Sequence, residues 1–158
     1  MKTLAIETTI PAGSLAFFSD GELLRAWPLP TEQRAAATLA SELQRALRAI
    51  DWSPRDVQLV AVSIGPGSFT GVRIGLVTAK MFAYAVGAHL IGVDSLDVVA
   101  HEVPESYSPL VVLADAQRGE VTAKVFTWEA NKGWMVKEQQ GLVRPQEWLT
   151  RLSLEQPF

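Results

Sequence analysis

The sequence predicts an α/β protein built around a parallel sheet, and two observations support this fold class. First, a nearly continuous apolar run at residues 59–64 leads through a glycine-rich turn into a long apolar segment at residues 68–87. An uninterrupted apolar run of this length is typical of a strand that is covered on both faces in a parallel sheet. Second, the order strand, hairpin, helix occurs twice along the chain. We therefore expect two related lobes.

The first lobe is expected over residues 1–106. It begins with three predicted strands, Leu4–Thr9, Ser14–Asp20 and Glu22–Leu29. The second and third strands form a hairpin about Asp20-Gly21, because this dipeptide favours a tight turn. An amphipathic helix follows over residues 32–50, since apolar side chains recur on one of its faces. These side chains are Leu39, Leu43, Ala46, Leu47 and Ile50.

The rest of the chain completes this lobe and begins a second one over residues 107–158. The first lobe continues with the strand Leu59–Ile64, the 68–87 helix, a strand at 90–93 and a helix at 95–102. The second lobe contains the strand Leu110–Asp115, a hairpin of Glu120–Glu129 with Trp134–Val143 about Asn131-Lys132-Gly133, and a helix that Pro145 opens and that runs to Leu152. This order predicts an actin/Hsp70/sugar-kinase-like fold with one complete lobe and a truncated second lobe.

Small residues recur every four positions along the 68–87 helix. They are Gly67, Gly71, Gly75, Ala79, Ala83 and Gly87. A glycine inside a helix costs roughly 1 kcal/mol relative to alanine, so the row indicates that another segment approaches this helix closely. Ser68 and Thr70 are both candidates for the N-cap of the helix.

The composition of the chain argues against several classes of function. The chain has 158 residues, 48% of them hydrophobic, no cysteine and a net charge of −3. The absence of cysteine excludes disulfides and thiolate metal sites, and the acidic balance without a Lys/Arg cluster argues against a nucleic-acid interface on this chain alone. The first residues have no signal-peptide pattern, so a cytoplasmic location is expected.

The loops that bind phosphate in kinases of this fold are incomplete here. In those kinases an acid is followed closely by glycine and Thr/Ser. Glu7-Thr8-Thr9 has no glycine before Gly13, and the glycine after Asp115 comes four residues late, at Gly119. Glu7, Thr8, Thr9 and Asp115 are therefore only weak candidates for a cofactor site, and carboxylates that bond local N–H groups are the preferred interpretation. No catalytic residue and no cofactor are predicted.

Metal chemistry is not predicted either. The two histidines, His89 and His101, have neither the spacing of metal ligands nor a pairing with a nucleophile and an acid. We expect His89 at the start of a strand and His101 on a solvated helix face.

Four motifs of this chain resemble the TsaB family, also called YeaZ. They are Leu4-Ala5-Ile6-Glu7-Thr8-Thr9, the segment from Gly65 to Gly75, the segment from Leu90 to Leu96, and Asp115-Ala116-Gln117-Arg118-Gly119-Glu120. The resemblance covers residues 1 to about 150, and members of the family usually continue well beyond residue 158.

The resemblance implies a non-catalytic subunit in the synthesis of N6-threonylcarbamoyladenosine in tRNA. Its partner would be a TsaD-like transferase, which transfers the acyl group of threonylcarbamoyl-adenylate to the N6 amine of an adenosine beside the anticodon. A TsaE-like ATPase would join the assembly, and tRNA would be bound only through the complex. TsaB proteins often keep a histidine near the start of their first long helix, where this chain reads Glu32-Gln33-Arg34. Two alternatives remain open: a small-molecule kinase or ATPase of the same fold, and a metallopeptidase-like protein.

The helices of the first lobe form the dimer face in TsaB-like proteins. The predicted interface residues are Gly71, Val72, Arg73, Gly75, Leu76, Ala79 and Lys80. Arg73 and Lys80 are seven positions apart and so project to nearly the same side of the helix. The sequence leaves open whether Leu76 and Phe82 belong to the core or to the interface. Because the helix is apolar on more than one side, we expect a homodimer when the chain is alone.

Overall fold

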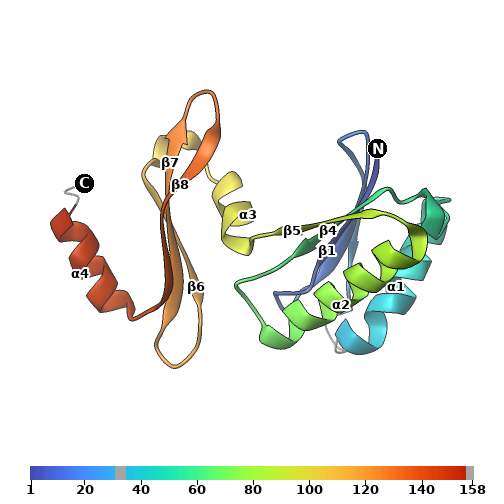
Figure 1. Cartoon of the computed structure of the whole chain (residues 1–158), viewed down its shortest axis with the longest axis horizontal. Helices are drawn as coiled ribbons and strands as arrows, with labels where there is room; N and C mark the ends of the chain where they lie inside the picture. Colours follow the sequence, from blue (N-terminus) through green and yellow to red (C-terminus); the bar gives the residue numbers. More distant parts are fainter. Residues whose placement is uncertain (31–34, 156–158) are drawn as a thin grey trace. The chain divides into compact units, whose positions relative to one another are not determined.

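The chain folds into two compact units, Met1–Asp94 and Ser95–Phe158, each with its own sheet (Figure 1). This is a computed structural model that describes the backbone of residues 1–30 and 35–155 and the side chains of 1–30 and 38–150. The sequence predicts a lobe boundary after residue 106. The boundary between the compact units lies earlier, because helix α3 (Ser95–His101) packs on the second sheet.

The first unit contains a five-stranded mixed sheet in the order β3-β2-β1-β4-β5. The strands are β1 (Lys2–Glu7), β2 (Ser14–Ser19), β3 (Glu22–Pro28), β4 (Leu59–Ser63) and β5 (His89–Val93). β1, β2 and β3 are antiparallel, whereas β1, β4 and β5 are parallel. The predicted hairpin is confirmed, and its turn has positive φ at both Asp20 (52°) and Gly21 (91°).

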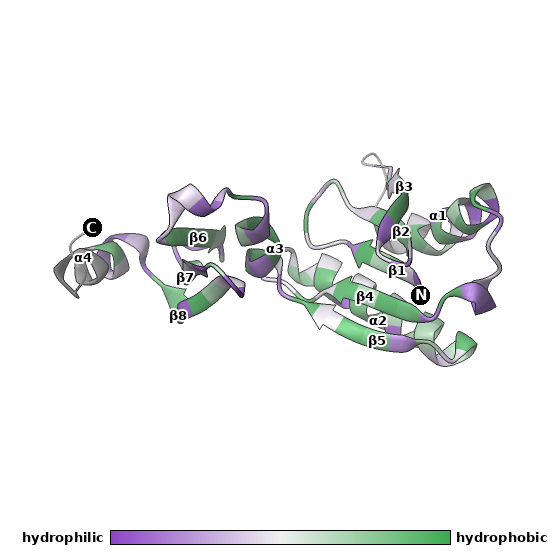
Figure 2. Cartoon of the chain, turned by 90° about the horizontal axis from the view of Figure 1, so that it is seen from above, coloured by the Kyte–Doolittle hydropathy of each residue, from purple (hydrophilic) through white to green (hydrophobic). Residues whose placement is uncertain are grey.

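Two helices, α1 (Ala35–Ala49) and α2 (Phe69–Val86), pack on the sheet of the first unit. Alternate strand residues point toward these helices, which places Leu4, Phe17 and Val60 in the core with Leu43 and Leu47 of α1. Figure 2 shows the apolar colouring of β4 beside α2. The predicted helix over residues 32–50 is confirmed from Ala35 onward, and residues 32–34 lie outside the described part of the chain.

The ends of α2 follow from the sequence. Ser68 is the N-cap, and its hydroxyl oxygen accepts a hydrogen bond from the Gly71 N–H at 3.2 Å. Gly87 ends the helix in the left-handed region, with φ at 75°. By length and composition alone, α2 is apolar enough to cross a membrane. One of its sides is nevertheless packed against the sheet, as in the core helix of a globular domain.

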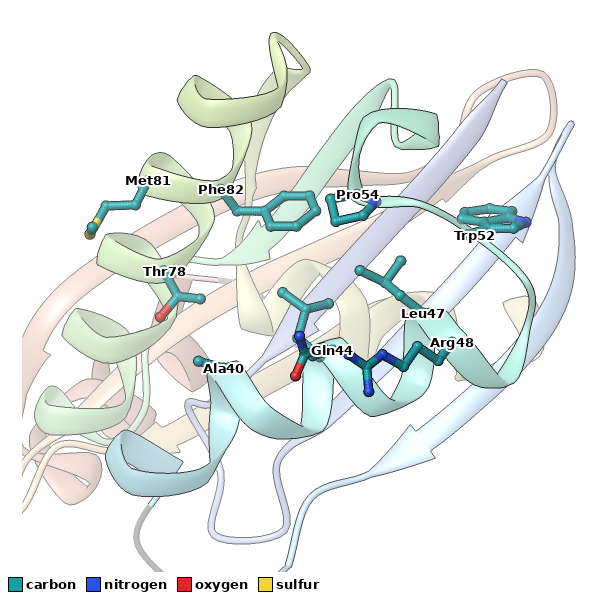
Figure 3. A pocket seen from close by; sticks show the side chains of 10 residues that line it. Ala40, Gln44, Leu47, Arg48, Trp52, Pro54, Thr78, Met81 and Phe82 are labelled. Atoms are coloured by element: carbon teal, nitrogen blue, oxygen red, sulfur yellow. The ribbon is translucent and has the colours of Figure 1, made fainter.

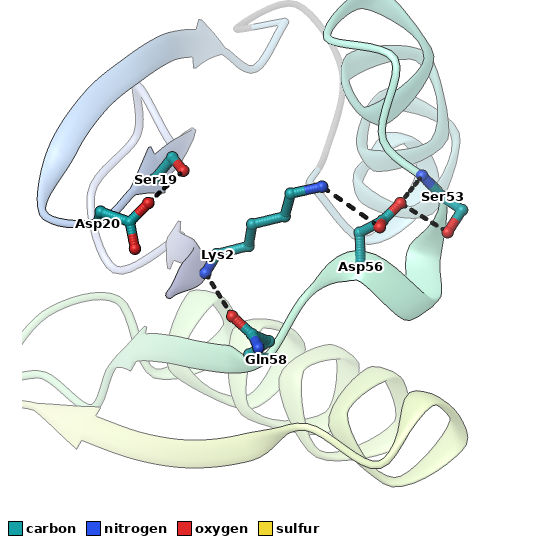
Figure 4. A network of polar contacts seen from close by, with 6 residues as sticks. All are labelled: Lys2, Ser19, Asp20, Ser53, Asp56 and Gln58. Atoms are coloured by element: carbon teal, nitrogen blue, oxygen red, sulfur yellow. Dashed lines mark hydrogen bonds and ion pairs between the residues drawn. The ribbon is translucent and has the colours of Figure 1, made fainter.

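A polar network holds the connection between α1 and β4 beside the start of β1 (Figure 4). The backbone of Lys2 exchanges hydrogen bonds with Gln58, and the Lys2 ammonium lies 3.3 Å from the Asp56 carboxylate. The Ser53 hydroxyl and N–H both donate to Asp56 at 2.7 Å. These bonds from Ser53, and then Lys2, lower the pKa of Asp56. The network therefore fixes the 3₁₀ turn η1 (Pro54–Asp56).

The second unit is a three-stranded antiparallel meander between two helices. Its elements are α3, η2 (Glu105–Tyr107), β6 (Leu110–Asp115), β7 (Val121–Glu129), β8 (Gly133–Val143) and α4 (Pro145–Glu155). Leu96 of α3 packs with Phe126, whereas Trp148 of α4 packs with Val125 on the other face of β7. The buried ammonium of Lys124 lies 2.7 Å from Asp97 of α3. The order β6, β7, β8, α4 repeats the order β1, β2, β3, α1.

Candidate partner interface

The small residues of α2 face the sheet of their own unit. A Cβ atom at Gly71 would lie 1.9 Å from the Thr8 carbonyl oxygen, and one at Gly75 would lie 2.4 Å from Thr8 Oγ1. The Thr8 hydroxyl donates a hydrogen bond of 2.8 Å to the Gly71 carbonyl. Ala79 and Ala83 continue the same buried side. The end of β1 is therefore the segment whose close approach the glycines permit.

This packing corrects part of the predicted interface. Gly71, Gly75 and Ala79 are buried within the first unit, so their assignment to a partner surface is wrong. Leu76 is half-buried and packs against the core, as does Phe82. Val72 is also half-buried, and its side chain borders the turn at Gly65.

The predicted residues Arg73 and Lys80 are exposed on the opposite side of α2. They share this side with four large apolar side chains that sequence reasoning missed. These are Phe69, Val77, Met81 and Tyr84, with 68%, 56%, 68% and 92% of each exposed. We call these six residues the outward face of α2. The row of glycine and alanine residues is the feature of the sequence that indicates this face. It marks the buried side of the helix, so the exposed residues are expected on the opposite side.

Arg73 stacks on an aromatic ring of the same helix. Its guanidinium carbon lies 3.9 Å from the centroid of the Phe69 ring one turn earlier. No ion pair joins Arg73 or Lys80 to a carboxylate within the part of the chain that the structure describes. Both cations are therefore open to a group from another molecule.

An apolar groove of about 610 Å³ runs between α1 and α2, next to the outward face (Figure 3). Leu43, Leu47 and Arg48 line it from α1, and Met81 and Phe82 line it from α2. The remaining lining residues are Ala40, Gln44, Trp52, Pro54 and Thr78. The polar network around Asp56 fixes the connection that carries Trp52 and Pro54, so one end of the groove has a defined shape.

The weak cofactor candidates are engaged in hydrogen bonds with backbone groups. The Glu7 carboxylate accepts a hydrogen bond from the Thr9 N–H, and the Thr9 carbonyl accepts one from the Ser68 N–H at 2.7 Å. Asp115 accepts a hydrogen bond of 2.8 Å from the Gln117 N–H. Both carboxylates thus bind backbone N–H groups within two residues, which is the interpretation that the sequence favours.

The histidines lie where the sequence predicts. His89 is the first residue of β5, and His101 is exposed at the end of α3, with Nδ1 2.7 Å from the Asp97 carbonyl oxygen. Within the residues that the structure describes, no three His, Asp or Glu side chains are grouped so that they would hold a metal ion. The Glu32-Gln33-Arg34 segment lies outside those residues.

The chain is similar to a known class of α/β proteins. Residues 27–138 match the family model described as TsaD: tRNA N6-adenosine threonylcarbamoyltransferase. YeaZ from Pseudomonas aeruginosa superposes with a TM-score of 0.74 at 24% identity, over 91% of this chain and 68% of that one. A second solved structure, a protein described as having similarity to peptidase YeaZ from P. aeruginosa, superposes with a TM-score of 0.76 at 23% identity. This match covers 91% of this chain and 67% of that one. The chain therefore has a TsaD/YeaZ-like α/β fold.

Curated relatives then define the family. The chain is 32% identical over 148 residues to the tRNA threonylcarbamoyladenosine biosynthesis protein TsaB of Escherichia coli, and 26% identical over 129 residues to that of Bacillus subtilis. These alignments cover 92% and 82% of this chain, and they span 64% and 56% of the length of the two relatives. The chain belongs to the TsaB (YeaZ) family, which confirms the resemblance of its motifs.

Proposed function

We propose that this chain is a non-catalytic subunit in the formation of N6-threonylcarbamoyladenosine in tRNA, and that it binds a TsaD-like transferase. The observation that carries this proposal is the outward face of α2 beside the α1/α2 groove. The names of the curated relatives, which describe proteins for biosynthesis of this modified nucleoside, supply the reaction that the complex would perform.

The outward face has the composition of a binding surface. Tyr84, Met81 and Phe69 are large, exposed and placed at helical spacing on one side of α2. Aromatic residues and methionine are enriched at protein interfaces, and contiguous exposed apolar patches of this kind mark interaction sites. A pair of helices from a partner would pack across α1 and α2 and place an apolar side chain in the groove between them.

The non-catalytic role rests on the state of the phosphate loops. Glu7 and Asp115 are occupied by N–H groups of their own loops, which leaves each carboxylate less available to position a metal ion. The full proposal adds a TsaE-like ATPase, tRNA that is bound through the complex, and a cytoplasmic location. A homodimer through the same α1/α2 surface would be the form of the chain without its partner.

Partner binding is tested by substitution on the outward face. Met81→Glu and Tyr84→Glu each place a charge in the proposed contact, whereas Leu24→Glu changes an exposed apolar residue on β3 of the same unit and serves as control. We expect the first two to weaken binding to a TsaD-like protein by about tenfold or more in calorimetry, and the control to leave it unchanged. Equal affinities for all three variants would contradict the location of the interface.

Activity assays and zinc analysis of the isolated chain test the proposed absence of catalysis. The isolated chain should show no turnover of ATP and no transfer of the threonylcarbamoyl group, and it should contain no stoichiometric zinc. ATP hydrolysis that is lost in Glu7→Ala or Asp115→Ala, with the melting temperature of the variant unchanged, would instead support the kinase or ATPase alternative. Stoichiometric zinc would support the metallopeptidase alternative.

A further inference from the structure

Methionine is the only sulfur-containing residue type in this chain. The sequence has three methionines, Met1, Met81 and Met135, and no cysteine, so no thiol would react with an oxidant in place of a thioether. Met1 is the N-terminal residue, and Met135 lies on β8 of the second unit with 37% of its side chain exposed. Met81 is therefore the one methionine whose oxidation would act on the outward face of α2.

Met81 lies in the middle of the outward face. Val77 is four residues before it and Tyr84 three residues after it, so both are its neighbours on the surface of the helix. Its side chain is 68% exposed. Met81 also lines the α1/α2 groove, and Figure 3 shows its side chain directed away from Pro54, whereas that of Phe82 points toward it. The thioether is therefore open to a small oxidant in the free chain and central in any contact that covers this surface.

We propose that Met81 is an oxidation site that controls pairing through the α1/α2 surface: its sulfoxide weakens the contact, and the contact shields the thioether from the oxidant. This inference rests on the proposed function for the position of the interface. It applies to a TsaD-like protein and to a second copy of this chain alike, because both would cover the same side of α2.

The modification requires only a peroxide such as hydrogen peroxide. A lone pair of the Met81 sulfur attacks one peroxide oxygen, so an S–O bond forms while the O–O bond breaks. The departing hydroxide takes the proton of the transferred hydroxyl group and leaves as water. The sulfur is oxidised by two electrons, and the peroxide is reduced by the same two. Methionine sulfoxide reductases reverse the change, because two thiols supply the electrons, become a disulfide and release the oxygen as water.

The sulfoxide changes the polarity of Met81 more than its size. A thioether is apolar and flexible, whereas the sulfoxide oxygen is a hydrogen-bond acceptor that water solvates in the free chain. A partner that covers Met81 removes this water, and an acceptor buried without a donor opposes binding. The same cover keeps peroxide away from the sulfur, so the bound chain should be oxidised more slowly than the free chain.

The experiment treats the whole chain with hydrogen peroxide and measures binding before and after. Peptide mass mapping identifies the oxidised methionines, and calorimetry gives the affinity for a TsaD-like protein. Treatment should weaken binding of the wild-type chain about tenfold or more, and sulfoxide reductases with dithiothreitol should restore it. Met135→Leu should lose affinity on treatment as the wild-type chain does. Met81→Leu, compared only with its own untreated sample, should keep its affinity although Met1 and Met135 are oxidised.

Three further measurements separate an effect on the contact from an effect on the fold. The melting temperature of the treated chain should equal that of the untreated chain. Saturation with the TsaD-like protein should slow oxidation of Met81 severalfold and leave the rate at Met135 unchanged. Met81→Gln, which places a polar amide at this position without any oxidant, should bind more weakly than Met81→Leu.

The outcomes separate the inference from the proposed function. The inference is overturned if a chain with sulfoxide at Met81 binds as tightly as the untreated chain, if treated Met81→Leu loses as much affinity as the treated wild-type chain, or if Met81 is oxidised equally fast in the free and the bound chain. Weaker binding that comes with a lower melting temperature overturns it as well. If no TsaD-like protein binds the untreated chain, the proposed function fails, and sedimentation of the chain alone decides the inference. Oxidation should then weaken self-association, and self-association that is unchanged or absent overturns the inference.

Discussion

Thr8, the residue that follows β1, shows how one residue sets the position of a helix. Its hydroxyl donates to the Gly71 carbonyl, and its oxygen atoms occupy the space where side chains at Gly71 and Gly75 would lie. Glycine at these two positions lowers the intrinsic stability of the helix, but it allows α2 to pack closely against the sheet. The sequence indicates that a close contact exists, but only the structure identifies Thr8 as the group that makes it.

We predict that Gly71→Ala destabilises the fold, although alanine is the better helix former. The new Cβ would lie 1.9 Å from a backbone oxygen, so β1 or α2 must shift, and overpacking of this kind costs about 1–3 kcal/mol. Thermal melting of the variant measures this loss. Gly141→Ala is the matched control, because no atom lies within 4 Å of its added Cβ, and it should melt at or near the wild-type temperature. Unchanged melting of Gly71→Ala would refute the contact with Thr8.

A second residue-scale prediction concerns Glu42. The hydrogen bond from Trp27 Nε1 at 2.8 Å, and then the contact with Arg45, lower the pKa of this carboxyl. A depressed pKa contributes stability above the ordinary value of 4.5, and this contribution disappears as the pH falls through the folded-state pKa. Trp27→Phe removes the donor, so the Glu42 pKa should rise in an NMR titration of its carboxyl carbon.

The stability difference between the wild-type chain and Trp27→Phe should accordingly be largest near neutral pH and should shrink in acid. Arg45→Met removes only the second contact and should raise the Glu42 pKa less. If Arg45→Met gave the larger rise, the ion pair and not the indole would be the main cause of the shift.

At the scale of elements, the sequence predicts nearly every strand and helix, because strands and helices here have clear periodicity and turn residues. The 68–87 helix also has clear ends at Ser68 and Gly87. The sequence does not specify its orientation, since apolar residues occur on more than one side of the helix. For this reason the predicted interface includes Gly71, Gly75 and Ala79, which the structure places on the buried side, whereas Arg73 and Lys80 lie on the exposed side.

The sequence also does not specify which sheet α3 packs on. From the sequence, a short helix with Leu96 and Ala100 on one side could pack on the sheet formed by the preceding strands or on the sheet formed by the following ones. In the structure it packs on β6 and β7, where the buried Lys124 ammonium meets Asp97. A pairing between residues 27 positions apart leaves no periodic pattern in the sequence.

The ion pair of α3 gives an element-scale prediction. Lys124 is buried, whereas 40% of the Asp97 side chain is exposed. Asp97→Ala removes the carboxylate, so the buried Lys124 ammonium loses this ion pair and is still shielded from water. Lys124→Met removes the cation and leaves an Asp97 carboxylate that water can solvate. Asp97→Ala should therefore lower the melting temperature more than Lys124→Met does. The reverse order would show that the ammonium is better solvated than its burial indicates.

At the scale of the whole molecule, every residue of the proposed partner surface belongs to the first unit. The groove and the outward face extend from Ala40 to Tyr84, within Met1–Asp94. The first unit has a hydrophobic core of its own, composed of residues of β1, β2, β4, α1 and α2. Folding of the first unit and binding of its partner should therefore not require the second unit.

We predict that a fragment of residues 1–94 folds alone and binds a TsaD-like protein nearly as tightly as the whole chain. The expectation follows because the fragment keeps the core, the polar network at Asp56 and the outward face of α2. A cooperative thermal transition establishes folding, and calorimetry should give a dissociation constant within about threefold of that of the whole chain, a difference under roughly 1 kcal/mol. The fragment 95–158 is the control and should not bind. A folded 1–94 fragment without affinity for a partner that the whole chain binds would place the contact in the second unit.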